Sequence, residues 1–240
     1  MGAEIEEAEL VLKDAQLKPS GNLRIDMPVS FGRLKVLPLL GMFQAQYPDI
    51  KLRLAFTDRY IDLVEDGVDI CLRLGQLQDS SLIARRLTGT PFSVVGAPGY
   101  FAKHTKPKRI DDLAAHDCLA FTYLETRLAW LWRFVDCGVE KTFTPQGAMS
   151  FSDGAAVCDA AIAGYGLAQL QGYFADAPIA NGALAVVLQK FKPQLEPVWL
   201  VYPQTRHLSP KVRVFADFMA AQFKSDSARR RSTLSRSRAR

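Results

Sequence analysis

The chain has 240 residues, of which 48% are hydrophobic and 23% charged, so it can bury a substantial core, and bulk disorder is excluded. No apolar run approaches the roughly 18 residues that a membrane span requires, and the acidic segment 1–7 lacks the apolar stretch of a secretory signal. We therefore expect a cytoplasmic protein with no membrane partner.

The formal net charge of +5 is concentrated at the C-terminus. Residues 224–240 hold seven basic residues and one acid, so the rest of the chain is close to neutral. The Ser/Arg composition predicts a disordered basic tail over 225–240. Such a tail could contact nucleic acid through phosphate charge. No aromatic residue is interleaved for base stacking, which favours an extension without a binding role.

No metal ion, cofactor or catalytic apparatus is predicted. The four cysteines form no C-x-x-C pair, and none has a zinc-site spacing to the three histidines, so we interpret them as idle thiols. The sequence contains no G-x-G-x-x-G pattern, Walker loop or G-x-S-x-G elbow. The alternating aromatic residues Trp130, Trp132 and Phe134 indicate the buried face of a strand rather than a ligand cage.

Alternating helices and strands are predicted in the N-terminal part. A helix over 3–17 with a short apolar seam is followed by a strand at 23–27, a tight turn at 28–32 and a helix from Leu34 to about Tyr47. A strand at 52–56, a short helix at 61–67 and strands at 68–74, 82–87 and 91–95 come next. This β-α-β-α-β order requires right-handed crossovers and a parallel sheet.

The same alternation begins again after residue 96. It predicts a helix at 110–115, strands at 118–122, 130–134, 139–143 and 148–151, and a helix at 155–163 capped by Asp153. Strands at 167–170, 184–188 and 198–202 and an amphipathic helix at 210–223 complete the pattern.

Two α/β units in series predict an α/β protein with two lobes. The chain is expected to cross between them near Val95–Gly96 and Pro197–Val198. The first lobe then comprises residues 21–95 plus 198–224, and the second residues 96–197. A ligand is expected between the lobes, because ligands bind at the carboxyl ends of strands in open α/β sheets.

Six segments in this order resemble the effector-binding domain of LysR-type transcriptional regulators. The resemblance covers Gly21 to about Lys224 and is carried by GNLRI at 21–25, PVSFG at 28–32, YPDI at 47–50, DLVEDGVDI at 62–70, LIARRL at 82–87 and AGYGLA at 163–168.

This resemblance implies two Rossmann-like subdomains around a ligand cleft, as in type 2 periplasmic binding proteins. It also implies a homodimer or tetramer. Members of the family begin with a winged helix-turn-helix and a linker helix, and residues 1–20 resemble only the end of that linker. We therefore expect DNA contact only through a helix-turn-helix domain absent from this chain, which would be a fragment or would act through other subunits.

Candidate ligand-binding residues in the first lobe lie at strand ends. Ser30 and Phe31 occupy the first strand-to-helix turn, where a hydroxyl and free N–H groups form an anion cradle, although Ser30 could simply cap the helix. The resemblance places effector contacts at this turn. Thr57 and Asp58 end the second strand and are expected to face the same cleft.

Arg73 and Gly75 end the third strand of the first lobe. Arg73 could bind a ligand carboxylate in a bidentate manner or pair with Asp69 or another acid of the chain. In the second lobe the candidates are Ser152, Asp153 and Gln171, of which Asp153 could be a helix cap only.

The sequence thus predicts a non-enzymatic sensor of a small organic effector, expected to be an anion. Three alternatives stay open: a free-standing solute-binding protein, a truncated subunit that acts only through full-length paralogues, and an enzyme on the same fold. The absence of a paired nucleophile and base disfavours the enzyme.

Overall fold

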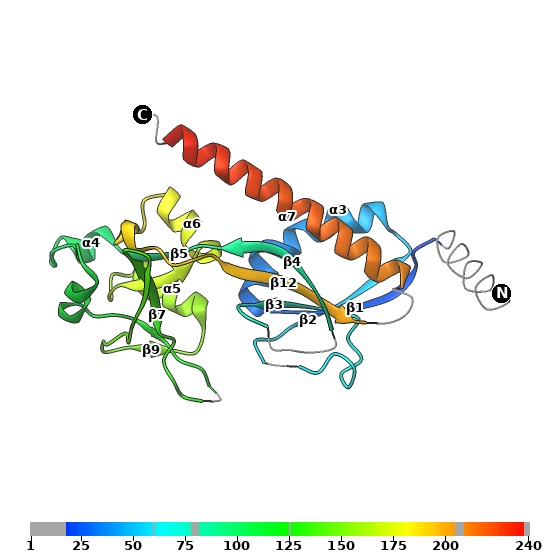
Figure 1. The fold of residues 1–240 in the computed structure, drawn as a ribbon, viewed down its shortest axis with the longest axis horizontal. Helices are drawn as coiled ribbons and strands as arrows, with labels where there is room; N and C mark the ends of the chain where they lie inside the picture. Colours follow the sequence, from blue (N-terminus) through cyan, green and yellow to red (C-terminus); the bar gives the residue numbers. More distant parts are fainter. Residues whose placement is uncertain (1–17, 60, 78–81, 125, 205–208, 238–240) are drawn as a thin grey trace. The chain divides into compact units, whose positions relative to one another are not determined.

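The computed structural model describes residues 18–59, 61–77, 82–124, 126–204 and 209–237, with backbone only over 226–237. The helix predicted at 3–17 lies outside these ranges. The chain forms two compact units, one comprising the chain up to Gly89 and from Pro197 onward, the other Thr90–Glu196 (Figure 1). The first crossing therefore lies at Gly89–Thr90, ahead of the predicted Val95–Gly96, and the second lies at Glu196–Pro197.

The first unit is built on a five-stranded sheet in the order β2-β1-β3-β12-β4. β1 runs parallel to both β2 and β3, which confirms the predicted parallel core, and β12 is antiparallel to β3. The strands are β1 (Gly21–Met27), β2 (Ile50–Phe56), β3 (Ile70–Leu74), β4 (Leu82–Thr90) and β12 (Glu196–Pro203).

A helical run begins earlier than predicted. The tight turn expected at 28–32 is instead α2 (Val29–Phe31), which continues through a π-helical turn, η1 (Gly32–Val36), into α3 (Leu37–Gln46). Pro38 follows the π-helical turn at the start of α3. Proline has no N–H to donate to the preceding turn, and π-helical turns and prolines are both sites where a continuous helix departs from regular α geometry. Gly32 permits close packing, since a Cβ there would lie 2.5 Å from Cγ of Met27.

The short helix predicted at 61–67 was wrong, because the chain forms turns there. The Asp62 carboxylate accepts hydrogen bonds from the N–H groups of Val64 and Glu65, at 2.8 and 3.1 Å. Side-chain oxygens that bind the nearby backbone in this way stabilise a turn instead of a helix. Gly67 has a φ of +62° and completes the reversal.

The last helix, α7 (Pro210–Ser237), packs on the helical run of the first unit (Figure 1). The rings of Phe215 and Phe218 lie 5.1 and 5.3 Å from the ring of Phe43. α7 is longer than predicted and continues through 225–237, where composition predicted disorder. Each residue added to a helix that packing has already nucleated gains a backbone hydrogen bond, which favours extension.

The second unit has a three-stranded antiparallel sheet and two ribbons. The sheet has the order β10-β5-β11, and the ribbons are β6-β9, which is parallel, and β7-β8, which is an antiparallel hairpin. The strands are β5 (Phe92–Gly96), β6 (Ala120–Phe121), β7 (Trp132–Asp136), β8 (Val139–Phe143), β9 (Ser150–Phe151), β10 (Ala168–Gln171) and β11 (Ala185–Val187).

Five short helices accompany these strands: α4 (Pro98–Phe101), the 3₁₀ helix η2 (Ile110–Ala115), α5 (Gly154–Ile162), α6 (Gly172–Ala180) and the 3₁₀ helix η3 (Gln189–Phe191). α6 was not predicted, because glycine at its start and Pro178 inside it both disfavour a helix.

Aromatic and aliphatic side chains fill the interior of the second unit. Trp132 and Phe134 are each 2% exposed, which confirms their predicted burial, whereas Trp130, predicted to share their buried face, is only partly buried. Three of the four cysteines are buried and all four are free thiols. Burial raises the pKa of Cys118 to about 12 and that of Cys158 to about 11, so neither forms a reactive thiolate near neutral pH.

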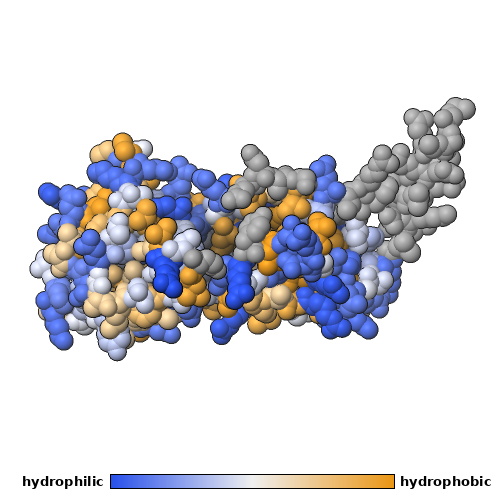
Figure 2. Space-filling model, turned by 90° about the horizontal axis from the view of Figure 1, so that it is seen from below, coloured by the Kyte–Doolittle hydropathy of each residue, from blue (hydrophilic) through white to orange (hydrophobic). Residues whose placement is uncertain are grey.

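Among the described residues, no helix combines the length and apolarity needed to cross a bilayer. Within the same ranges, no three His, Cys, Asp or Glu side chains gather closely enough to hold a metal ion. Hydrophilic and apolar residues are interspersed on the face drawn in Figure 2.

Candidate functional site

The carboxyl ends of β1 and β2 lie side by side in the first unit. Met27 pairs with Phe56 in the parallel register, and the Thr57 N–H donates to the Met27 carbonyl at 3.0 Å. One residue further on, the Asp58 carboxylate accepts a hydrogen bond from the Val29 N–H at 3.1 Å. The structure therefore brings three predicted residues, Ser30, Thr57 and Asp58, to one edge of the sheet.

Contacts within the chain define what these side chains do. Asp58 caps the helical run at Val29, and the Thr57 hydroxyl accepts from the Arg59 N–H at 3.1 Å. Ser30 is half-buried in the first turn of α2. The Phe31 ring is buried and stacks on the Phe223 ring at 5.7 Å, so this side chain belongs to the core.

Arg73 is engaged with an acid of the chain itself. Its Nη1 atom lies 3.3 Å from Oδ1 of Asp26, whose side chain is only 2% exposed. Its Nη2 atom donates to the Ile61 carbonyl at 3.4 Å. Of the two alternatives left open for Arg73, the structure thus shows pairing within the chain. The partner is Asp26, since Asp69 instead binds Nζ of Lys211 at 3.0 Å.

Asp26 is a buried carboxyl in the penultimate position of β1. Burial raises its pKa above the ordinary value, while the Cys71 thiol and the Arg73 guanidinium oppose that shift. The Cys71 sulfur lies 3.4 Å from Oδ1 of Asp26. β1 and β3 are therefore joined by a polar cluster directly behind the turn that holds Ser30.

Gly75 shapes the end of β3. Its φ is +85°, a conformation that glycine adopts without steric cost. Its N–H donates to the Pro197 carbonyl at 2.9 Å, and its own carbonyl accepts from the Trp199 indole at 2.8 Å. Both backbone groups of Gly75 are thus bound to β12.

The candidate ligand-binding residues of the second unit lie at two separate positions in the chain. Ser152 and Asp153 are exposed between β9 and α5. The Asp153 carboxylate accepts from the Ala155 N–H at 3.0 Å, which confirms the predicted helix cap. Gln171 is half-buried at the end of β10, with its amide nitrogen 3.5 Å from Oε2 of Glu196.

A cluster around Arg133 was not found from the sequence. Its guanidinium carbon lies 4.9 Å from the centre of the Trp130 ring and 5.1 Å from that of Phe92. Its Nη2 atom lies 2.7 Å from Oε1 of Glu196. Arg133 alternates with Trp132 and Phe134 along β7 and therefore reads as an exposed position. The only sign of this cluster in the sequence was a basic residue placed between the aromatic residues Trp132 and Phe134.

The strand position of Arg133 is fixed by a side chain from β10. Its N–H donates to Oε1 of Gln169 at 2.9 Å, and the Gln169 amide donates to the Arg133 carbonyl at 2.8 Å. Gln169 is almost fully buried. Its side-chain amide makes the two hydrogen bonds to the Arg133 backbone that a neighbouring strand would otherwise make. These bonds fix the backbone of Arg133, and so help to position its guanidinium against the Phe92 ring.

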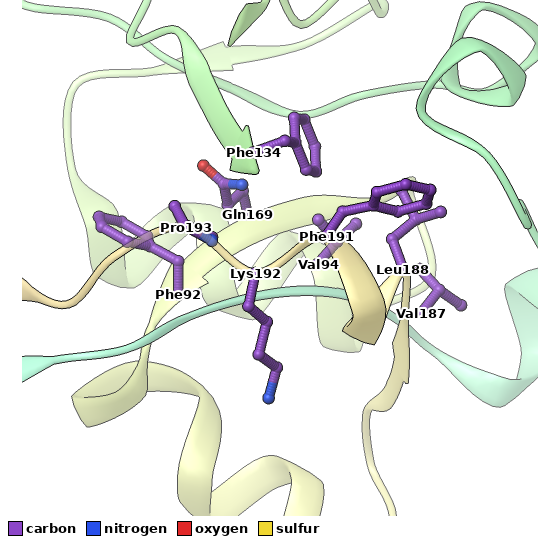
Figure 3. A pocket seen from close by; sticks show the side chains of 9 residues that line it. All are labelled: Phe92, Val94, Phe134, Gln169, Val187, Leu188, Phe191, Lys192 and Pro193. Atoms are coloured by element: carbon purple, nitrogen blue, oxygen red, sulfur yellow. The ribbon is translucent and has the colours of Figure 1, made fainter. Parts of the chain in front are cut away.

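Next to this cluster is a small pocket with about 200 Å³ of space, part of it open to solvent. Figure 3 shows the lining side chains, with that of Lys192 extending away from the others. The centre of a water-sized molecule has only about 10 Å³ of room here, whereas ligand pockets usually span about 300–1,000 Å³, so this space alone is too small for an effector. The lining is apolar apart from Gln169 and Lys192: Phe92, Val94, Phe134, Val187, Leu188, Phe191 and Pro193.

Comparison with known proteins identifies the family of this chain. Residues 16–224 match the model of the LysR substrate binding domain. The chain is 34% identical to the HTH-type transcriptional regulator CrgA of Neisseria meningitidis over 206 residues, covering 85% of this chain and 68% of CrgA. It is 32% identical to an HTH-type transcriptional repressor of Pseudomonas aeruginosa over 221 residues, 92% of this chain and 69% of that protein.

A solved structure shows the same fold. The CrgA regulatory domain superposes with a TM-score of 0.76 at 32% identity, covering 85% of this chain and all of that domain. The two α/β units are thus those of LysR regulatory domains, which have the type 2 periplasmic-binding-protein fold. The chain belongs to the LysR-type transcriptional regulators, of which residues 16–224 form the substrate binding domain.

Proposed function

We propose that this chain senses a small organic anion in the cytoplasm and thereby controls transcription, with no catalytic role of its own. The observation that carries the proposal is the meeting of Ser30, Thr57 and the start of the helical run at one sheet edge. Ligands of open α/β sheets bind at the carboxyl ends of the strands. Helix N-termini there favour negative charge.

Asp58 is the negative group that this turn already holds. Its carboxylate already lies on the Val29 N–H at 3.1 Å, so this turn stabilises a negative group. A ligand anion would take the place of this carboxylate on the Val29 N–H, since the two negative groups repel each other, and would also bind through the Ser30 and Thr57 hydroxyls. Arg73 then acts through Asp26, by holding β1 and β3 together behind the turn. In the second unit, Ser152 and Gln171 are proposed as further polar contacts.

Self-association is part of the proposal, since relatives in this family act as oligomers on DNA. β2 is the last strand at one side of the first-unit sheet. On the helical run, Leu34, Leu37 and Met42 are 48, 49 and 51% exposed, and Phe56 of β2 is 36% exposed. An apolar face beside an edge strand is typical of a surface that pairs with a second copy.

Ligand binding would then act by shifting populations. A ligand that prefers one arrangement of the domain stabilises it by its difference in affinity for the two states. In a LysR-type regulator this arrangement sets the geometry of the DNA-binding parts of the oligomer.

The test is a calorimetric and thermal-shift screen with a panel of organic anions. For an anion that binds, Ser30→Ala and Thr57→Ala should each weaken binding about tenfold, because a hydrogen bond to a charged group contributes about 1.5 kcal/mol or more. Thr142→Ala, on the exposed strand β8, is the matched control and should bind as the wild type does. If no anion binds, or if all three variants bind it equally, the proposal fails.

A further inference from the structure

Arg133 contacts both strands by which the chain enters and leaves the second unit. Phe92 opens β5, just after the first crossing at Gly89–Thr90, and Glu196 is the last residue before the second crossing. The guanidinium packs on the Phe92 ring and pairs with Glu196. One side chain on β7 thus joins the two ends of this unit.

The pairing of Arg133 is incomplete. Nη2 makes the single contact with Glu196, at 2.7 Å, while Nε is buried and has no hydrogen-bond partner among the described residues. A carboxylate that matches a guanidinium fork fills two neighbouring N–H groups. Glu196 fills one, and its other oxygen lies 3.5 Å from the amide nitrogen of Gln171. Glu196 therefore holds the guanidinium by one contact and not by a two-point fork, which makes the pair easier to displace.

The two members of the pair differ in access to solvent. The Arg133 side chain is 41% exposed, whereas that of Glu196 is 4% exposed. An anion from solution can therefore reach the guanidinium without first removing the protein around Glu196. Trp130, which packs on the guanidinium, is itself 5.9 Å from the Tyr123 ring. The approach to Arg133 is flanked by aromatic surface, which suits a carboxylate carried on a flat, apolar body.

We infer that Arg133 binds the carboxylate of an aromatic carboxylic acid, and that Glu196 is an internal carboxylate which competes with the ligand for this guanidinium. The inference rests on the proposed sensing function and names its ligand class. When the ligand carboxylate takes over the guanidinium, Glu196 and the start of β12 are released from β7. β12 continues into the five-stranded sheet of the first unit. The exchange therefore removes the ion pair that fixes the first residue of β12.

Benzoate is the probe, with acetate at equal concentration to test the aromatic body and sodium chloride to control for ionic strength. Binding to the full chain is followed by calorimetry and by tryptophan fluorescence, since Trp130 lies against the guanidinium. Glu196→Gln removes the competing charge and should tighten benzoate binding about tenfold, while Arg133→Gln should weaken it about tenfold or more. Trp130→Phe should remove the fluorescence response, although Trp132 and Trp199 remain.

Asp136→Asn is the matched control. It breaks the pair between Asp136 and Lys141, which is 2.7 Å long and lies on the same hairpin as Arg133. This variant should bind benzoate as the wild type does. If Glu196 is only a structural anchor, Glu196→Gln will lower the melting temperature without tightening binding, and the inference is then overturned. Equal benzoate affinity of Arg133→Gln and wild type overturns it as well.

A folding defect in Glu196→Gln does not leave the question open. Arg133→Lys keeps the charge but lacks the planar fork, so it should bind benzoate about tenfold more weakly than wild type; unchanged affinity contradicts the inference. The proposed sensing function is tested separately through Ser30→Ala. Should an anion bind in a way that depends on Ser30 but not on Arg133, the sensing function stands and only this inference falls.

Discussion

The Arg73 guanidinium lies 3.3 Å from the buried carboxylate of Asp26, so the cation that sequence patterns suggested as a ligand group is an internal partner. The pair joins β3 to β1 next to Met27, whose carbonyl accepts from the Thr57 N–H. A change at Arg73 therefore acts first on the fold. Any effect on ligand binding would follow from movement of the turn that holds Ser30.

Arg73→Met should lower the free energy of unfolding by about 3–5 kcal/mol, because removing one partner of a buried ion pair leaves an uncompensated charge. The double variant Asp26→Asn/Arg73→Met should lose less than the single variant, since the buried charge is gone. Urea unfolding measures both. Lys141→Met breaks an exposed ion pair on β7–β8 and should change stability little. A double variant that is less stable than Arg73→Met would contradict this account.

The Gly164-Tyr165-Gly166 motif holds two glycines for different reasons. Gly164 has a φ of +81° after α5. Gly166 has no such φ, but a Cβ there would clash with the Asp117 carbonyl oxygen. Gly166→Ala should therefore destabilise the second unit by about 1–3 kcal/mol, as overpacking against rigid backbone does.

Gly99→Ala is the control for Gly166→Ala. A Cβ at Gly99, in the short helix α4, would meet no atom within 4 Å. Thermal unfolding of Gly99→Ala should stay within about 0.5 kcal/mol of wild type or show a slight gain. Equal losses in the two alanine variants would exclude close backbone approach as the reason for Gly166.

Sequence reasoning reached the parallel core of the first unit because β1, β2 and β3 have clear apolar alternation and are separated by turn residues. It missed the turns at 61–67 because apolar spacing cannot show that the Asp62 carboxylate binds two backbone N–H groups. It placed Ser30, Thr57 and Asp58 at one edge from strand order alone. The partners of Arg73 and Arg133 could not be predicted, since Asp26 and Glu196 are distant in sequence.

Met42→Glu should convert the proposed dimer to a monomer. Met42 is 51% exposed on α3, on the apolar face proposed for the dimer, and a charge within an apolar interface opposes association. Light scattering after size-exclusion chromatography gives the mass. Leu195→Glu changes an equally exposed residue, 52% exposed, in the second unit, and should leave the mass unchanged. A wild-type chain that is monomeric at high concentration rules out this face as a dimer surface.

The His116 ring should make the second unit less stable in mild acid. Burial, then the neighbouring His104, lowers the pKa of His116, opposed by the carboxylates of Asp112 and Asp117. The Tyr100 hydroxyl lies 3.2 Å from Nδ1 of His116. In mild acid the folded state therefore binds fewer protons than the unfolded state. The free energy of unfolding then falls as the pH drops from about 7 toward the folded pKa of His116, which lies below the ordinary histidine value of about 6.5.

His116→Asn keeps a polar atom near the Tyr100 hydroxyl but does not titrate. The difference in urea midpoint between this variant and wild type should therefore shift in favour of the variant as the pH falls from about 7.5 to about 5.5. Comparing the two proteins at each pH removes the contribution of other groups, among them Asp26, whose raised pKa acts in the opposite sense at lower pH. A difference that does not change with pH would mean that His116 titrates alike in the folded and unfolded chains.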